Sequence, residues 1–100
     1  MKTDFQFVSM PPSEALETYT LSKLDNLYKK YEDIIHTTVF FKQENNPKGL
    51  GKICEMEISI SGPRIFASSD EKNYELAVKN TISDLEKQLK KRKGTLKPYM

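Results

Sequence analysis

The chain has 100 residues and a formal net charge of +2, with 37% hydrophobic and 30% charged side chains, as in one soluble globular domain. Its apolar runs are only a few residues long, and its first residues lack the apolar run of a secretory signal, so we expect neither a membrane span nor a leader. The single cysteine, Cys54, excludes an internal disulfide and fits a reducing compartment. The cytoplasm is therefore the expected location.

The first part of the chain predicts a strand followed by a helix. Residues 3–8 alternate polar and apolar side chains, which predicts a strand with Phe5 and Phe7 on one face. Two prolines then interrupt the strand, because neither can donate a backbone hydrogen bond. Ser13 is expected to cap a helix over 13–31, whose leucines and tyrosines form one apolar stripe.

The middle of the chain predicts three strands. Residues 35–43 are rich in β-branched and aromatic side chains, which favours a strand, and 44–52 has the Asn, Pro and Gly of an exposed loop. Residues 53–61 alternate apolar and polar side chains, which is typical of an antiparallel strand with one wet face. A Gly-Pro turn then leads into a short fourth strand over 64–68.

A second helix completes the fold. Ser69 or Asp70 is expected to cap it, and Gly94 to fray or end it, which leaves 94–100 as a tail. Its predicted buried stripe consists of Tyr74, Val78, Ile82, Leu85 and Leu89, flanked by Ala77 and Thr81. The order β-α-β-β-β-α predicts an α+β fold with two layers, in which both helices cover one face of a four-stranded sheet. We expect the chain, 1–100, to form this single domain.

The positive charge is concentrated at the C-terminal end. Residues 1–86 carry 10 basic and 14 acidic side chains, a net of −4, whereas 87–100 carry six basic side chains and no acidic one. On the second helix a ridge outside the buried stripe is formed by Lys79, Ser83, Lys87, Lys90 and Lys97, with Lys91 and Lys93 adjacent, and residues 90–93 are four cations in a row. A helix dipole needs only one or two cations, so this cluster predicts a polyanionic partner. The helix lacks the exposed aromatic or leucine face that a membrane surface would require, which favours nucleic acid.

The first helix offers two more candidate cations. Lys23 and Lys30 lie seven residues apart and therefore on one face. They either extend the basic surface of the second helix or only keep the first helix soluble among its acidic residues. Tyr28 and Tyr99 are expected to be exposed, and either could stack on a base.

Catalytic arrangements are not found in the sequence. With His36 as the single histidine, no histidine-based metal cluster or Ser-His-Asp triad can be assembled. Cys54 occupies an inward position of a regular strand and is expected to be a small core side chain. We therefore expect no enzyme, metal, cofactor or small-molecule substrate.

Two stretches carry a family resemblance. They consist of Ala15-Leu16, Tyr19, Lys23-Leu24, Leu27, Tyr31 and Ile34 in the first helix, and of Ile65, Ala67-Ser68, Tyr74, Ala77, Asp84-Leu85, Gln88-Leu89, Lys91 and Lys93 in the C-terminal third. In these residues the chain resembles the short ribosome hibernation-promoting factors, also known as ribosome-associated translation inhibitors. The similarity covers nearly the whole chain except 44–52.

The resemblance implies a specific site of action. It implies the same β-α-β-β-β-α fold and a monomer that binds the small ribosomal subunit near the decoding centre. Bound there, the family blocks messenger and transfer RNA and inhibits translation in stationary phase. The residues at basic family positions, which face ribosomal RNA, are Lys23, Lys87, Lys91, Lys93 and Lys97, with Arg92 at a position that can be His. Lys30, Lys79 and Lys90 are predicted from helical spacing alone.

The chain also departs from the family. Gly94-Thr95 stands where a charged pair is common, and because the chain ends at Met100, the C-terminal dimerisation domain of long members is expected to be missing. The alternative is a free-standing double-stranded RNA-binding module, which also lays two helices on a small sheet. Such modules need lysines at the start of the second helix, where this chain has Asp70 and Glu71.

Overall fold

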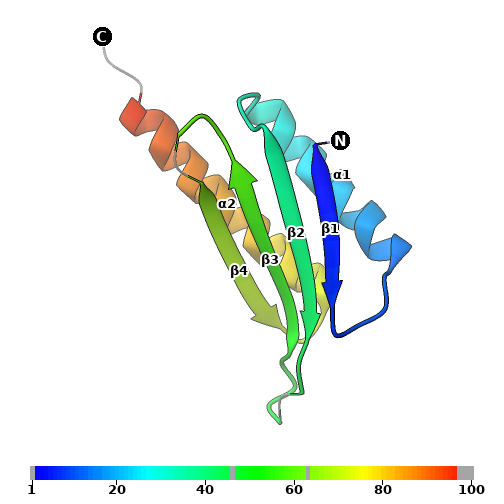
Figure 1. Ribbon diagram of the computed structural model, residues 1–100. Coiled ribbons are helices and arrows are strands. Elements are labelled where there is room, and N and C mark those ends of the chain that lie inside the picture. Colours follow the sequence, from blue (N-terminus) through cyan, green and yellow to red (C-terminus); the bar gives the residue numbers. More distant parts are fainter. Residues whose placement is uncertain (1, 46, 63, 97–100) are drawn as a thin grey trace.

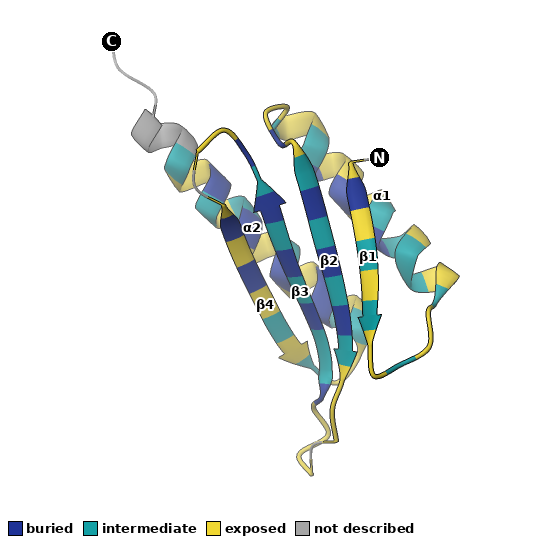
Figure 2. Cartoon of the chain, viewed as in Figure 1, coloured by how far each residue is buried: buried dark blue, intermediate teal, exposed yellow. Residues whose placement is uncertain are grey.

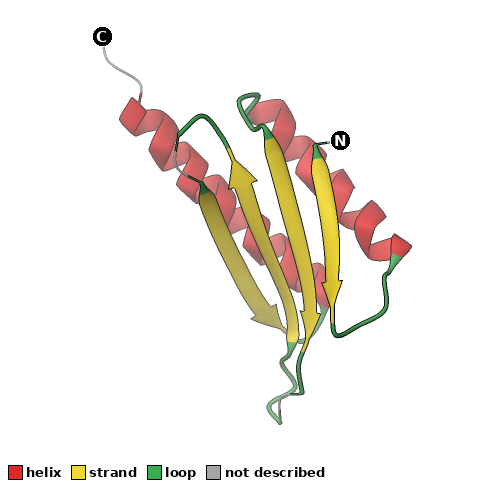
Figure 3. Ribbon diagram, viewed as in Figure 1, coloured by secondary structure: helices red, strands yellow, loops and turns green. Residues whose placement is uncertain are grey.

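The computed structural model describes residues 2–45, 47–62 and 64–96, with side chains described as far as Arg92. Six elements follow one another in the predicted β-α-β-β-β-α order (Figures 1 and 3). They are β1 (Thr3–Val8), α1 (Glu14–Lys30), β2 (His36–Gln43), β3 (Lys52–Ser59), β4 (Ile65–Glu71) and α2 (Tyr74–Leu96). The predicted α+β class is confirmed.

The strands form one sheet in the order β1-β2-β3-β4. β1 pairs with β2 in parallel, whereas β2–β3 and β3–β4 are antiparallel. A parallel pair needs a crossover connection, and α1 supplies it, whereas the antiparallel strands follow one another through short links. Both helices lie behind the same face of the sheet in Figure 1, as the sequence predicts.

The hydrophobic core fills the space between the sheet and the helices. Alternate side chains of the central strands face it, and Val39, Phe41, Met56 and Ile58 are fully buried. Figure 2 shows the resulting alternation of buried and more exposed positions along β2 and β3. The helices contribute Leu24, Leu27, Ala77, Val78, Leu85 and Leu89. Among the residues that the structure describes, no helix covers the other face of the sheet (Figure 1).

The ends of the helices follow the sequence in part. Ser13 caps α1 as predicted, because its hydroxyl accepts a hydrogen bond of 3.2 Å from the backbone N–H of Leu16. α2 runs through Gly94 to Leu96, so the predicted end at Gly94 falls two residues short. The rest of the predicted tail, 97–100, lies outside the described residues.

The start of α2 differs from the sequence prediction. β4 does not end at Ser68 but continues to Glu71, which pairs with Lys52 of β3. The predicted cap at Ser69 or Asp70 is therefore wrong, since both residues are in the strand. The actual cap is Asn73, whose side-chain oxygen accepts a hydrogen bond of 2.8 Å from the backbone N–H of Leu76. Pairing with β3 outweighs the local capping preference of serine and aspartate.

Cys54 lies in the core as predicted, with no exposed surface. Burial raises the pKa of its thiol to about 12, although a hydrogen bond with Thr81 acts in the opposite direction. The thiolate, which is the reactive form, is therefore almost absent at neutral pH.

We expect the Cys54 thiol of the folded protein to react with a disulfide reagent at pH 8 at least about a thousandfold more slowly than in urea, since the side chain is fully buried and burial raises its pKa to about 12. Absorbance of the released aromatic thiol measures both rates. The urea-unfolded chain serves as the control, in which one thiol per chain should react at the ordinary rate. Rapid reaction of one thiol in the native protein would contradict a buried structural role.

Candidate nucleic-acid interface

α2 presents its two faces to different surroundings. Ala77, Val78, Thr81, Leu85 and Leu89 form the stripe against the sheet, each at most 3% exposed. Lys79, Ser83, Lys87 and Lys90 are among the exposed side chains on the opposite side of the helix. Residues three, four and seven apart share a helix face, so the burial of one stripe directs the other into solvent. We call Lys79, Lys87 and Lys90 the basic ridge.

Two side chains anchor the last turns of α2 to the β3–β4 hairpin. Gln88 donates from Nε2 to the carbonyl oxygen of Phe66 at 2.9 Å, and Arg92 donates from Nη2 to that of Ser61 at 3.1 Å. The anchors hold this end of the helix on the sheet, while Lys90 and Lys91 remain exposed. The positively charged end of α2 is therefore held to the sheet both by its buried stripe and by these two hydrogen bonds to the β3–β4 hairpin.

Arg92 is placed differently from the other predicted RNA-binding residues. It follows Leu89 by three residues and Leu85 by seven, so it continues the stripe that faces the sheet. Its guanidinium lies against Gly62, and its Nε is buried without a hydrogen-bond partner among the described residues. The geometry therefore supports a structural role, which the spacing from the two leucines could have revealed in the sequence. Its prediction as an RNA contact gains no support from this position.

Two further predicted positions cannot be placed at this interface. Lys93 lies within α2, but the structure does not describe its side chain. Lys97 lies outside the described residues altogether.

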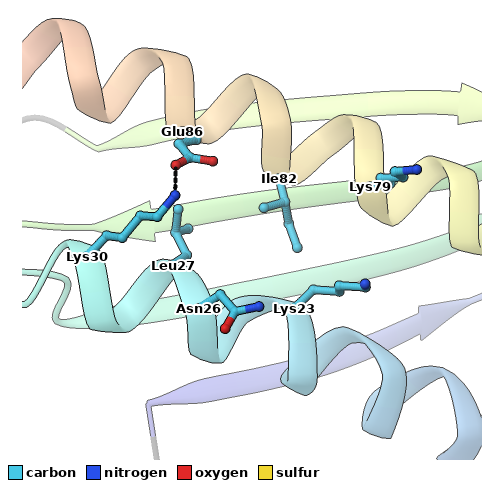
Figure 4. A pocket seen from close by; sticks show the side chains of 7 residues that line it. All are labelled: Lys23, Asn26, Leu27, Lys30, Lys79, Ile82 and Glu86. Carbon is cyan, nitrogen blue, oxygen red and sulfur yellow. Dashed lines mark hydrogen bonds and ion pairs between the residues drawn. The ribbon is translucent and has the colours of Figure 1, made fainter.

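A groove separates α1 from α2 and brings together three of the predicted lysines (Figure 4). Its volume is about 250 Å³, and it is lined by Lys23, Asn26, Leu27 and Lys30 of α1 and by Lys79, Ile82 and Glu86 of α2. Lys23 and Lys79 lie towards one end, and Lys30 and Glu86 lie at the other. We call this feature the α1–α2 groove.

Glu86 closes one end of the α1–α2 groove. Its Oε2 lies 2.7 Å from the Nζ of Lys30, an ion pair that joins the two helices. The hydrogen bond to Glu86 raises the pKa of Lys30, so this amine stays protonated and partly neutralised by its partner. Glu86 cannot be singled out from the sequence, because its proximity to Lys30 depends on how the two helices pack. Asn26 lies three residues after Lys23 on α1, but its place in a groove likewise depends on the packing of α2.

The open face of the sheet is electrostatically different from the helix layer. There Lys42 is paired with Glu55 at 3.1 Å, and Arg64 is paired with Glu57 at 3.2 Å. These acids offset the cations on that face, which agrees with the wet, glutamate-bearing strand that the sequence predicts. The charges of these ion pairs on the open face therefore balance, whereas basic residues outnumber acidic ones on α2.

Two tyrosines, Tyr28 and Tyr99, are predicted from the sequence to be exposed. Tyr28 is not exposed as predicted: it packs against the core and donates a hydrogen bond of 2.8 Å to the hydroxyl of Thr37. Tyr99 lies outside the described residues. The half-buried position of Tyr28 therefore gives no support to its predicted stacking on a base.

Other kinds of site find no support in the described part of the chain. Within it, no three His, Cys, Asp or Glu side chains are grouped so that they could hold a metal ion. None of the described helices is long and apolar enough to cross a membrane.

Comparison with known proteins identifies the family. The model of the family described as "Sigma 54 modulation protein / S30EA ribosomal protein" matches residues 3–97. The chain belongs to this family. The ribosome-associated family expected from the sequence resemblance is thereby confirmed, and its members are ribosome hibernation and interface factors. No match was found among curated protein sequences.

Two solved structures share the fold of this family member. A ribosomal subunit interface protein from Coxiella burnetii is 23% identical, with a TM-score of 0.81, over 94% of this chain and 99% of that one. The N-terminal domain of Protein Y from Thermus thermophilus is 15% identical, with a TM-score of 0.73, over 91% of this chain and 98% of that one. At such low identity these likenesses show the fold alone.

The contact between Arg92 and Gly62 can be tested by stability measurements. Gly62 has a φ of +117°, and a Cβ there would collide with the Arg92 guanidinium, which would have to give up its bond to Ser61. Gly49 has a φ of +82° with open space around it. We expect Gly62→Ala to lower the free energy of unfolding by about 1 kcal/mol more than Gly49→Ala.

Urea unfolding of both variants gives this difference, and a double-mutant cycle with Arg92→Ala isolates the contact from backbone strain. Gly62→Ala should cost less in the Arg92→Ala background than in the wild type. An equal cost in both backgrounds would refute the anchoring role of Arg92.

Proposed function

We propose that this family member binds the RNA of the small ribosomal subunit near the decoding centre through its helix layer, and so blocks messenger and transfer RNA. The observation that carries the proposal is the basic ridge, whose three lysines point into solvent from the helix face opposite the core. The family resemblance supplies the small subunit and the decoding channel. A similar fold in a protein named a ribosomal subunit interface protein supports association with the ribosome.

The chemistry of the ridge suits the phosphate backbone rather than base edges. Lysine places a compact charge on a flexible stem, which complements single phosphate oxygens without fixing a base sequence. Neutralised phosphates release counterions, and this release provides affinity that depends on salt. Binding of this kind needs shape and charge but no catalytic group.

Inhibition would then result from occupancy. A folded domain in the channel excludes messenger and transfer RNA by volume, and its release restores the ribosome unchanged. We propose that the protein acts in this way as a cytoplasmic monomer during stationary phase or starvation. This role would store idle ribosomes rather than degrade them.

Generic duplex RNA binding is less compatible with the charge distribution. Although α2 begins later than predicted, at Tyr74, its first turn still carries an acidic residue, Glu75. The ridge cations Lys87 and Lys90 lie in the other half of the helix. Phosphates approaching the start of α2, as in duplex-binding modules, would meet an acid there.

Charge reversal of Lys87, Lys90 and Lys91 to Glu should weaken co-sedimentation with small subunits about a hundredfold or more, because attraction to phosphates becomes repulsion. Inhibition of translation in vitro should be lost in parallel. A charge-matched control reverses Lys2, Lys48 and Arg64, which are exposed but lie outside both helices.

The control variant should bind more nearly like the wild type, and circular dichroism should show both variants folded. Subunit binding that survives the reversal of Lys87, Lys90 and Lys91 would place the RNA contact elsewhere. Competition by duplex RNA of arbitrary sequence as effective as by subunits would favour the duplex-binding alternative.

Salt should weaken subunit binding steeply. With four to six phosphate contacts, the logarithm of the association constant should fall against the logarithm of salt concentration with a slope of roughly −3 to −5. Titration of labelled protein with small subunits over a range of potassium chloride measures the slope. A flat dependence would argue for a protein partner on the ribosome instead.

A further inference from the structure

The α1–α2 groove combines an apolar floor with an uneven distribution of charge. Leu27, only 2% exposed, and the half-buried Ile82 lie at the seam between the helices. Lys23 and Lys79 carry exposed cations towards one end. At the other end Glu86 offsets the charge of Lys30. An anion is therefore attracted mainly to the end with Lys23 and Lys79.

A cation–π contact and an ion pair favour the observed positions of Lys23, Lys30 and Glu86 around the groove. The Nζ of Lys23 lies 5.4 Å from the centre of the Tyr19 ring, a cation–π contact that favours its place on the rim. The ion pair between Lys30 and Glu86 links the two walls. Asn26 adds an exposed amide, which can both donate and accept hydrogen bonds.

We propose that the α1–α2 groove receives one unstacked nucleotide of the bound RNA. Its phosphate would lie between Lys23 and Lys79, and its base or ribose would lie against Leu27 and Ile82 within reach of Asn26. The inference rests on the proposed function, since it assigns a specific role to one part of the same RNA-binding surface. It adds a contact with a base or sugar to the phosphate contacts of the basic ridge.

The dimensions and chemistry of the groove fit this ligand. Its volume of about 250 Å³ is below that of typical pockets for drug-sized molecules, roughly 300–1,000 Å³, and suits one base or one sugar. Proteins recognise RNA largely through unstacked nucleotides, whose flat apolar faces and polar edges need both kinds of surface. A contact with phosphate alone would not use the apolar floor.

The groove can be filled without changing its charge. In an Asn26→Cys variant the introduced thiol is exposed, whereas Cys54 is buried, so N-ethylmaleimide should label the groove selectively in the folded protein. The matched control is Ile35→Cys, labelled in the same way, because Ile35 is 63% exposed and does not line the groove.

Labelling of the Asn26→Cys variant should weaken binding to small subunits on the order of tenfold relative to the unlabelled variant. The salt slope should stay unchanged, because no charge is altered. Labelling of the Ile35→Cys variant should have no effect. Equal affinity of the labelled and unlabelled Asn26→Cys proteins would overturn the inference.

A second measurement distinguishes insertion of a nucleotide into the α1–α2 groove from contact of a phosphate with the lysines at its rim. Methyl NMR spectra of the wild-type protein are recorded with a short single-stranded oligoribonucleotide and, separately, with inorganic phosphate. The oligoribonucleotide should shift the methyl signals of Leu27 and Ile82, and phosphate should not. Unshifted methyl signals at saturating oligoribonucleotide would show that nothing enters the groove.

The two proposals fail in different ways. If the wild-type protein does not bind small subunits, the proposed function is wrong. If it binds them while the groove label and the oligoribonucleotide have no effect, only the nucleotide site is wrong.

Discussion

The sheet buries only one of its faces, and the arrangement of the molecule depends on this constraint. Because β1 and β2 are parallel, the chain must cross over between them, and α1 makes this crossover on the buried side. α2 returns to the same side after β4, so the two helices lie next to each other. Every feature assigned to RNA binding, the basic ridge and the α1–α2 groove included, belongs to this helix layer.

Packing also explains how a concentrated positive charge is tolerated. The lysines of the ridge repel one another, and the sequence after residue 86 adds six cations and no acid. The buried stripe through Leu85 and Leu89 and the bonds from Gln88 and Arg92 fix the helix on the sheet. Core burial therefore stabilises a charge distribution that would destabilise an isolated helix, and holds it in one orientation relative to the sheet.

The acidic residues complement this arrangement. Glu55 and Glu57 offset the cations of the open sheet face, so the body of the domain is not uniformly basic. Such polarity favours one orientation of the protein as it approaches a phosphate surface. Glu86 acts at shorter range, since it neutralises one end of the groove and leaves the other end cationic. Acidic residues thus offset cations at two scales: on the open face of the sheet, and at one end of the α1–α2 groove.

Periodicity and composition in the sequence determined the six elements, their order, the alternation of faces along β1 and β3 and the cationic side of α2, because these depend on local spacing. The family could also be inferred from short residue patterns. Only the tertiary structure decided the rest. Because β4 pairs with β3, it extends beyond Ser69. The carbonyl oxygen of Ser61 accepts a hydrogen bond from Arg92. The packing of the two helices places Lys30 next to Glu86. These contacts join residues distant in the chain, and local spacing carries no information about which distant groups meet.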